Sequence, residues 1–571
     1  IQMNSPRQWL PPFVLLVCWS LLTGCQATAQ RPSIVENNGQ PLPSVAQLRK
    51  DFLYQPDAAT RYMRLAELEA QALALYSDEP LRLGSIGSAI LEIYPASYTG
   101  HLVLEKFYRN LESTEAQLLH EAWVQHLDQS IAASGEGTID SPYVVMGSYD
   151  AKVFITQRTL TEAGSIYQNS RQTPLGLTVL ARANNQQPLQ NLSFDLSHLL
   201  AAFTEDQAGD QPPQPNNPWR ILRNLADQQD SAAQAAIGAY LAKQNRFAAA
   251  VNWLEAAARP GNLLAHSLLA RIYWFQASNK QSDSNAAGNG DPQEPSREEF
   301  KQLALNHHLQ AIAAGSTESM YSLGRLYIEG YYGDGNDAEG IALLEQAGQL
   351  GSAESLLYLG HQFRTGQHLE KNPTTAQRYL EQAAELQNPT AIISYARFLT
   401  TATGQENITA HDDLLPWLLE LADANNAEAM LILGNFNARG IAVAQSTRKA
   451  LRWYKKAVRN AGSHHHGAAE IINEVSWTLA TTAIGELRNS RYAQDIMNQL
   501  MESDREARDR PEYLDTWANT YAANGDFKTA IEVQQRAIKK AQEQQRNDVL
   551  EILRRHLDLF RAGNHVIDQV P

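Results

Sequence analysis

The sequence predicts a mainly α-helical protein in which a small α+β domain precedes an α-solenoid of helix–turn–helix repeats. Three observations support this fold class. A phrase of 36 to 38 residues recurs in the second half of the chain, each copy has two amphipathic halves, and β-rich runs are confined to residues 137–200. A single pair of helices cannot bury both of its apolar stripes, so neighbouring copies must stack.

Length, charge and cysteine content narrow the class of protein. The 571 residues exceed one ordinary domain, and a hydrophobic fraction of 43% is enough to build cores. The net charge of -15 argues against nucleic acid as the main partner, because phosphate binding needs a basic surface. The two cysteines are Cys18 and Cys25, so the remaining chain has no disulfide framework and no cysteine metal site.

Residues 1–24 are predicted to be a lipoprotein signal peptide. The apolar run Trp9–Leu22 is shorter than the roughly 20 residues of a membrane span and has the length of a signal-peptide core. Leu22-Thr23-Gly24-Cys25 resembles the bacterial lipobox, which implies that Cys25 becomes the lipid-modified N-terminus. The alternative is an ordinary signal peptide with a chance cysteine.

Residues 25–45 are rich in Gln, Pro, Asn and Ser and are expected to form a flexible tether. Gln26 follows the cysteine, whereas an Asp there would suggest retention in the inner membrane. We therefore expect a lipid anchor at the outer membrane, on its periplasmic face.

Residues 46–200 are predicted to form the α+β domain. Helical patterns cover Ala58–Tyr76 and Glu115–Ile131. Turn residues separate four β-rich runs, which predict a small antiparallel sheet: 152–156, 164–168, 175–182 and 190–195. The Pro-rich segment 201–220 follows as a linker.

Residues 221–470 contain the repeats. The first half of the phrase is clearest at 318–327, 353–363 and 427–436, and degenerate copies begin near 232, 265 and 389. The period is 36 residues from Gly324 to Gly360 and two periods of 37 from Gly360 to Gly434. The copy near 265 carries an insert, 278–296, that is rich in Ser, Asn, Gly and Asp and is expected to be a solvated loop.

Small and aromatic residues recur at fixed places in this phrase. A glycine inside a helix costs about 1 kcal/mol relative to alanine, so close approach of the paired helix is the expected reason for Gly324, Gly360 and Gly434. Glycines one turn later suit helix C-termini: Gly330, Gly366 and Gly440. Aromatic residues are expected to fill the core between helices: Trp253, Tyr379 and Trp453.

This pattern resembles the Sel1-like repeat, a relative of the tetratricopeptide repeat. The pattern changes in residues 471–571, where 511–537 closely resembles a tetratricopeptide unit, 474–502 is predicted to be another, and 542–560 is expected to be a capping helix. Lipoproteins with such repeats act as scaffolds in envelope assemblies, so the resemblance implies protein partners. The alternative is a set of unrelated amphipathic helices.

Candidate chemistry is sparse. His464-His465-His466 on a loop gives poor geometry for one metal site, and adjacent helical residues such as His307 and His308 point apart. Asp140, Asp150 and Asp195 flank predicted strands, where turn and edge roles are expected. No phosphate loop, serine elbow, zinc-protease or dinucleotide motif occurs in the sequence. We expect no catalytic residue, metal or cofactor, and therefore no enzyme.

The predicted function is a lipid-anchored periplasmic scaffold whose solenoid binds other envelope proteins. One alternative is a binding module for cell-wall or exported polysaccharide that uses the α+β domain. The other is an envelope enzyme with its site in that domain.

Overall fold

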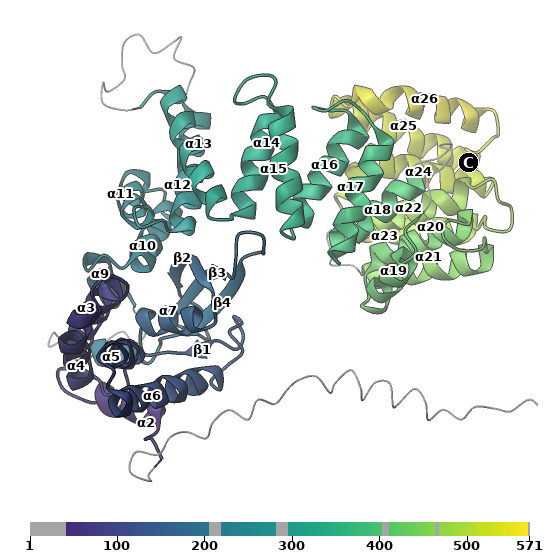
Figure 1. The fold of residues 1–571 in the computed structure, drawn as a ribbon. Helices are drawn as coiled ribbons and strands as arrows, with labels where there is room; N and C mark the ends of the chain where they lie inside the picture. Colours follow the sequence, from purple (N-terminus) through teal and green to yellow (C-terminus); the bar gives the residue numbers. More distant parts are fainter. Residues whose placement is uncertain (1–40, 205–217, 281–294, 402–409, 463–466, 569–571) are drawn as a thin grey trace, which may run out of the picture. The chain divides into compact units, whose positions relative to one another are not determined.

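The structure is a computed structural model that describes residues 41–204, 218–280, 295–401, 410–462 and 467–568 (Figure 1). Cys25, most of the predicted tether and linker, and His464-His465-His466 lie outside the described residues. The described residues form two compact units, unit 1 (1–319) and unit 2 (320–571). None of the described helices is both long and apolar enough to cross a membrane.

Unit 1 begins with helices. They are α2 (Val45–Leu53), α3 (Ala58–Leu75), η1 (Pro80–Arg82), α4 (Leu83–Ile93), α5 (Tyr98–Asn110), α6 (Thr114–Ala132), α7 (Ser148–Gln157) and α8 (Leu199–Thr204). The two long predicted helices correspond to α3 and α6, which differ from the predicted bounds by one residue at most. Both follow the helical spacing of their apolar residues.

A four-stranded sheet accompanies these helices, in the order β1 (Tyr143–Val144), β4 (Gln190–Asp195), β3 (Gly176–Arg182), β2 (Thr161–Gln168). The strands β2, β3 and β4 are antiparallel as predicted, and the short β1 pairs parallel with β4. The small α+β region is thereby confirmed.

One predicted strand is wrong, because residues 152–156 form part of helix α7. The Asp150 carboxylate accepts a hydrogen bond from Met146 N at 3.1 Å, which closes the first turn of the helix. Val153, Phe154 and Ile155 are all buried. A short run that is buried on every side has no periodicity that would separate a helix from a strand.

The remaining helices of unit 1 are α9 (Trp219–Asp227), α10 (Ser231–Lys243), α11 (Phe247–Ala258), α12 (Leu263–Asn279) and α13 (Arg297–Ala313). Strand β2 packs against α10 and α12, and Asn262 Nδ2 donates a 2.7 Å hydrogen bond to Ser165 O. One hydrophobic cluster runs from Phe52 to Ala304. The sheet and the first two helix pairs therefore share a core.

Unit 2 continues the helix pairs. They are α14 (Thr317–Ile328, whose first three residues belong to unit 1) with α15 (Asp337–Gln349), α16 (Ala353–Thr365) with α17 (Pro373–Glu385), α18 (Pro389–Thr401) with α19 (Leu414–Asp423), α20 (Ala427–Arg439) with α21 (Thr447–Ala461), α22 (Ala468–Thr481) with α23 (Ser490–Ser503), and α24 (Pro511–Ala523) with α25 (Phe527–Glu543). The predicted starts near 318, 353, 389 and 427 are confirmed. Unit 2 is thus a solenoid of helix–turn–helix repeats.

A short helix η3 (Ala507–Asp509) precedes α24, and α26 (Asn547–Arg561) closes the stack. The capping helix starts five residues later than predicted, because α25 extends to Glu543 and Gln545 adopts a left-handed φ of 56° in the turn. After α26 the chain turns back. Val566 N donates to the buried Asn519 Oδ1 on α24 at 2.9 Å, and Asp568 N donates to Thr481 O on α22 at 2.8 Å.

Candidate functional site

The first helices α14, α16, α18, α20 and α22 present one side chain each to a common face. A small residue in the middle of each first helix packs toward the second helix, and the next residue is rotated by about 100° onto another face. These following residues define what we call the A-helix face: Arg325, His361, Arg397, Asn435 and Trp477. The equivalent residue of α24, Asn519, is buried and accepts from Val566 N. The residues of the A-helix face differ in type from repeat to repeat, which suits a recognition surface better than a structural position.

Two cavities open on the A-helix face. The aromatic cavity, about 540 Å³, is formed by α14, α16, α18 and Leu380 of α17, and its lining includes Tyr321, Leu357, Tyr358, His361 and Phe398. The rings of Tyr321 and Tyr358 meet edge to face with centroids 6.1 Å apart, a geometry that aromatic pairs favour. Tyr358 Oη donates a 3.2 Å hydrogen bond to Glu329 Oε1, which fixes its ring.

The acidic cavity, about 580 Å³, adjoins the first and is formed by α18, α20, α22 and α24. It is lined by Arg397, Glu428, Glu470, Asn473, Glu474, Trp477 and Tyr513. Arg397 lines both cavities. The two cavities therefore form one continuous surface across neighbouring repeats.

Arg397 joins three repeats at the centre of this surface. Its Nε lies 2.6 Å from Glu428 Oε1 and its Nη1 lies 3.3 Å from Glu474 Oε2. Burial by itself lowers the pKa of the Arg397 guanidinium, but the carboxylates of Glu474 and Glu428 outweigh that effect and the pKa is raised. Asn435 Nδ2 donates to Glu474 Oε1 at 3.3 Å and extends the network.

The residues of α22 and α24 that line the acidic cavity make hydrogen bonds and an ion pair of their own. Trp477 Nε1 donates a 2.7 Å hydrogen bond to Asp568 Oδ2 in the C-terminal segment. Arg510 Nη1 donates to Tyr513 Oη at 2.9 Å and lies 3.6 Å from Glu470 Oε1. The buried Oδ1 of Asn473 has no hydrogen-bond partner within the described part of the chain.

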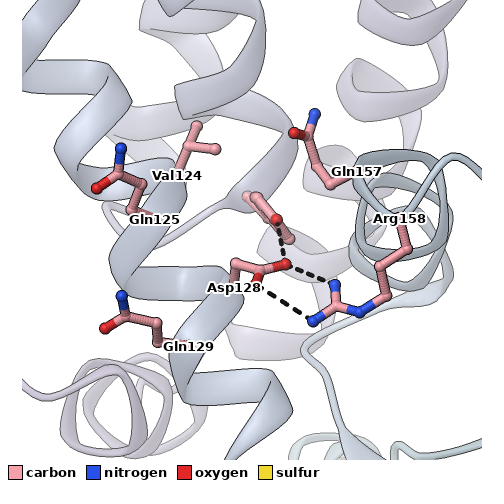
Figure 2. A pocket seen from close by; sticks show the side chains of 7 residues that line it. Val124, Gln125, Asp128, Gln129, Gln157 and Arg158 are labelled. Carbon is pink, nitrogen blue, oxygen red and sulfur yellow. Dashed lines mark hydrogen bonds and ion pairs between the residues drawn. The ribbon is translucent and has the colours of Figure 1, made fainter. Parts of the chain in front are cut away.

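Unit 1 contains a separate polar cavity of about 480 Å³ between α6 and α7 (Figure 2). Its lining consists of Tyr98, Val124, Gln125, Asp128, Gln129, Gln157 and Arg158. Arg158 binds both carboxylate oxygens of Asp128, at 2.6 and 3.2 Å, and Tyr98 Oη donates to Asp128 Oδ1 at 3.0 Å. Burial first, and then Asp128, raise the pKa of Tyr98. The charges cancel, so this cavity presents mainly amide groups.

The predicted repeat positions lie as follows. An ideal Cβ on Gly434 would fall 2.5 Å from the Tyr454 ring on the paired helix, and one on Gly324 would fall 2.9 Å from Gly340 O. Three glycines have left-handed φ angles of 73° to 76° at the ends of first helices: Gly330, Gly366 and Gly440. Gly360 faces Leu380 of its paired helix.

The three aromatic residues chosen from the sequence differ in burial. Tyr379 is buried and packs beside Phe363, with ring centroids 5.7 Å apart. Trp253 and Trp453 are partly buried, with Arg223 and Lys456 over their rings. Tyr454, the neighbour of Trp453, is the residue that is fully buried.

Within the described ranges, no group of three potential ligands is suitably spaced to hold a metal ion. His308 is buried, and His307 Nδ1 lies 2.9 Å from His266 Nδ1. Asp195 accepts from Ser197 N at 2.8 Å in a turn, and Asp140 is exposed. Asp150 accepts backbone hydrogen bonds from Met146 and Tyr98.

Sequence reasoning did not single out the residues of the acidic cavity. Glu428 is the ion-pair partner of Arg397, and neither residue belongs to the recurring small and aromatic positions. The sequence does contain a signal for this surface, because the residues that follow the central small residue of each first helix lie on one face. Aligning those positions would have identified Arg397 and Trp477.

Comparisons with known proteins agree with the repeat assignment. A family model for the Sel1 repeat matches residues 317–352, 353–388 and 427–461. A search of the curated proteins found no significant match.

Among solved structures, the chain is similar to a Sel1 repeat protein from Oxalobacter formigenes (18% identity, 47% of this chain and 100% of that chain covered, TM-score 0.31). It is also similar to a protective antigen of uropathogenic Escherichia coli that displays an SLR fold (15% identity, 87% of this chain and 95% of that chain covered, TM-score 0.39). Yeast Tom70 is a third match (10% identity, 86% of this chain and 96% of that chain covered, TM-score 0.29).

Sel1 repeats are thus present in this chain. Such repeats generally mediate protein–protein interactions, and proteins built from them are typically non-catalytic scaffolds.

Proposed function

We propose that this protein is a lipid-anchored scaffold on the periplasmic face of the outer membrane, and that its A-helix face binds other envelope proteins. The observation that carries the proposal is the pair of adjoining cavities that share Arg397. They expose aromatic, cationic and anionic groups side by side, a combination that protein interfaces use. No catalytic activity is proposed.

The anchor rests on the sequence around Cys25. Two or three acyl chains on that cysteine would attach the protein firmly, because each buried methylene contributes about 0.8 kcal/mol. Metabolic labelling with a palmitate analogue tests this. Labelled wild type and unlabelled Cys25→Ala are expected, whereas an unlabelled wild-type chain would contradict the anchor.

The partner surface is tested with two matched charge reversals. Arg364 lines the aromatic cavity on α16, and Arg452 is exposed on the second helix α21. Affinity purification followed by mass spectrometry should show that Arg364→Glu loses partners that Arg452→Glu retains. Identical partner sets for both variants would contradict a role for the A-helix face.

A second candidate function is binding of cell-wall or exported polysaccharide through the α+β region. The polar cavity favours it, because the glutamine amides at 125, 129 and 157 can donate to and accept from sugar hydroxyls. Sedimentation with purified sacculi tests this, with Gln125→Ala and Gln129→Ala as variants. Equal sedimentation of wild type and variants would reject the cavity as the receptor.

A further inference from the structure

We propose that the acidic cavity binds a cationic side chain, lysine or arginine, on an extended segment of a partner protein. This inference rests on the proposed function of the A-helix face and names the chemistry of the partner.

The charge of the cavity lining favours a cation. Three carboxylates, Glu428, Glu470 and Glu474, line the cavity with one cation, Arg397. Arg397 is within ion-pair distance of Glu428 and Glu474. Glu470 has only Arg510 at 3.6 Å, and its side chain is 69% exposed. The lining keeps a negative excess, which attracts a cation and repels an acidic peptide.

Aromatic rings on one wall of the cavity also favour a cation. Trp477 and Tyr513 line the same cavity, and the faces of such rings attract ammonium and guanidinium groups. The hydrogen bond from Trp477 Nε1 to Asp568 and the tilted contact of its ring with His556, with centroids 5.7 Å apart, fix the indole. Because the Trp477 ring is already fixed, less side-chain entropy is lost when a ligand binds against it.

Asn473 adds a hydrogen-bond acceptor beside the cavity. Asn473 Oδ1 is buried and has no hydrogen-bond partner in the described part of the protein. An unsatisfied buried acceptor costs about 1–3 kcal/mol. Lysine and arginine side chains are donors without acceptors, so they would satisfy this atom if a rotation of the Asn473 amide brings it into the cavity, and a carboxylate would not. No trio of ligands is spaced for a metal ion among the described residues, which favours an organic cation.

The extended form of the segment is inferred from two contacts of the chain with itself. In unit 1, Asn262 at the start of α12 donates to the carbonyl of Ser165 in strand β2. In unit 2, Asn519 on α24 accepts from Val566 N in the C-terminal segment. First helices of this solenoid thus already bind non-helical backbone, a strand in unit 1 and the C-terminal segment in unit 2.

The test uses the full mature chain labelled with 5-fluorotryptophan, with the Trp477 signal assigned from Trp477→Phe. Nα-acetyl-lysine amide and Nα-acetyl-arginine amide are titrated at constant ionic strength, and Nα-acetyl-glutamine amide is the neutral probe. The two cations should shift the Trp477 fluorine signal saturably, and the neutral amide should not. Glu470→Gln should weaken the response about threefold or more, since one carboxylate is lost. Glu532→Gln, an exposed change of equal charge on α25, should leave it unchanged.

An unmoved Trp477 signal, or equal shifts with all three amides, would overturn the inference. The proposed function fails separately, through the partner sets of Arg364→Glu and Arg452→Glu. If the two variants capture different partners but the cations cause no Trp477 response, the proposed scaffold function is supported and the cation site is rejected.

Discussion

Arg397 Nε lies 2.6 Å from Glu428 Oε1 and so joins the first helices of two successive repeats. The same guanidinium reaches Glu474 one repeat further on. A similar contact occurs in unit 1, where Arg271 lies 3.5 Å from Glu318. Cross-repeat ion pairs between first helices therefore occur in both units, and in unit 2 they also form the floor of the A-helix face.

We predict that Arg397→Ala destabilises unit 2 by about 1 kcal/mol, since two carboxylates lose their shared cation at a site that is partly open to solvent. Urea unfolding at low and high salt measures this. The cost should shrink at high salt because partly exposed charges are screened. A cost that does not depend on salt would show that packing, and not charge, makes Arg397 important.

Gly434→Ala should destabilise the protein by about 1–3 kcal/mol, because the new Cβ would lie 2.5 Å from the fully buried Tyr454 ring. The control is Gly485→Ala, whose Cβ would meet nothing within 4 Å. Thermal unfolding of the two variants decides between them. Equal melting temperatures would refute close helix approach as the reason for the glycine.

His308→Leu should stabilise unit 1 more at pH 5 than at pH 7. Burial is the main cause that lowers the pKa of His308 to about 4, so the folded protein holds this side chain neutral while the unfolded chain, with a pKa near 6.5, takes up a proton below that pH. Wild type therefore loses stability as pH falls from about 6.5 to 4, by about 2 kcal/mol at pH 5. Urea unfolding at both pH values measures the difference. An equal gain in the free energy of unfolding at pH 5 and pH 7 would disprove that the buried His308 is neutral.

The capping helix α26 is predicted to depend on a buried hydrogen bond between His556 and Asp515. His556 Nδ1 lies 2.9 Å from both carboxylate oxygens of Asp515, and Gln534 Nε2 donates to Asp515 Oδ1 at 2.6 Å. His556→Ala should cost about 1–3 kcal/mol, because it leaves a buried carboxylate without its hydrogen-bond partner on α26. The double variant Asp515→Asn, His556→Gln should cost less in chemical denaturation. A larger cost for the double variant would refute this account.

The repeats could be predicted because their period, central glycines and buried aromatic residues are local and recur. The helix at 152–156 could not, because Val153, Phe154 and Ile155 are apolar on all sides and the capping hydrogen bond of Asp150 is not visible in a pattern. The acidic cavity was missed for a different reason. Its lining comes from four first helices, and Arg397 and Trp477 occupy equivalent positions with different chemistry.

Site-specific photo-crosslinking in living cells tests the central claim most directly, that the A-helix face is where partners bind. A photoreactive amino acid is placed at exposed His361, on that face, and in a second strain at exposed Arg452 on α21. We predict discrete adducts with envelope proteins from position 361 and none from position 452. Adducts from 452 alone, or the same adducts from both positions, would contradict it.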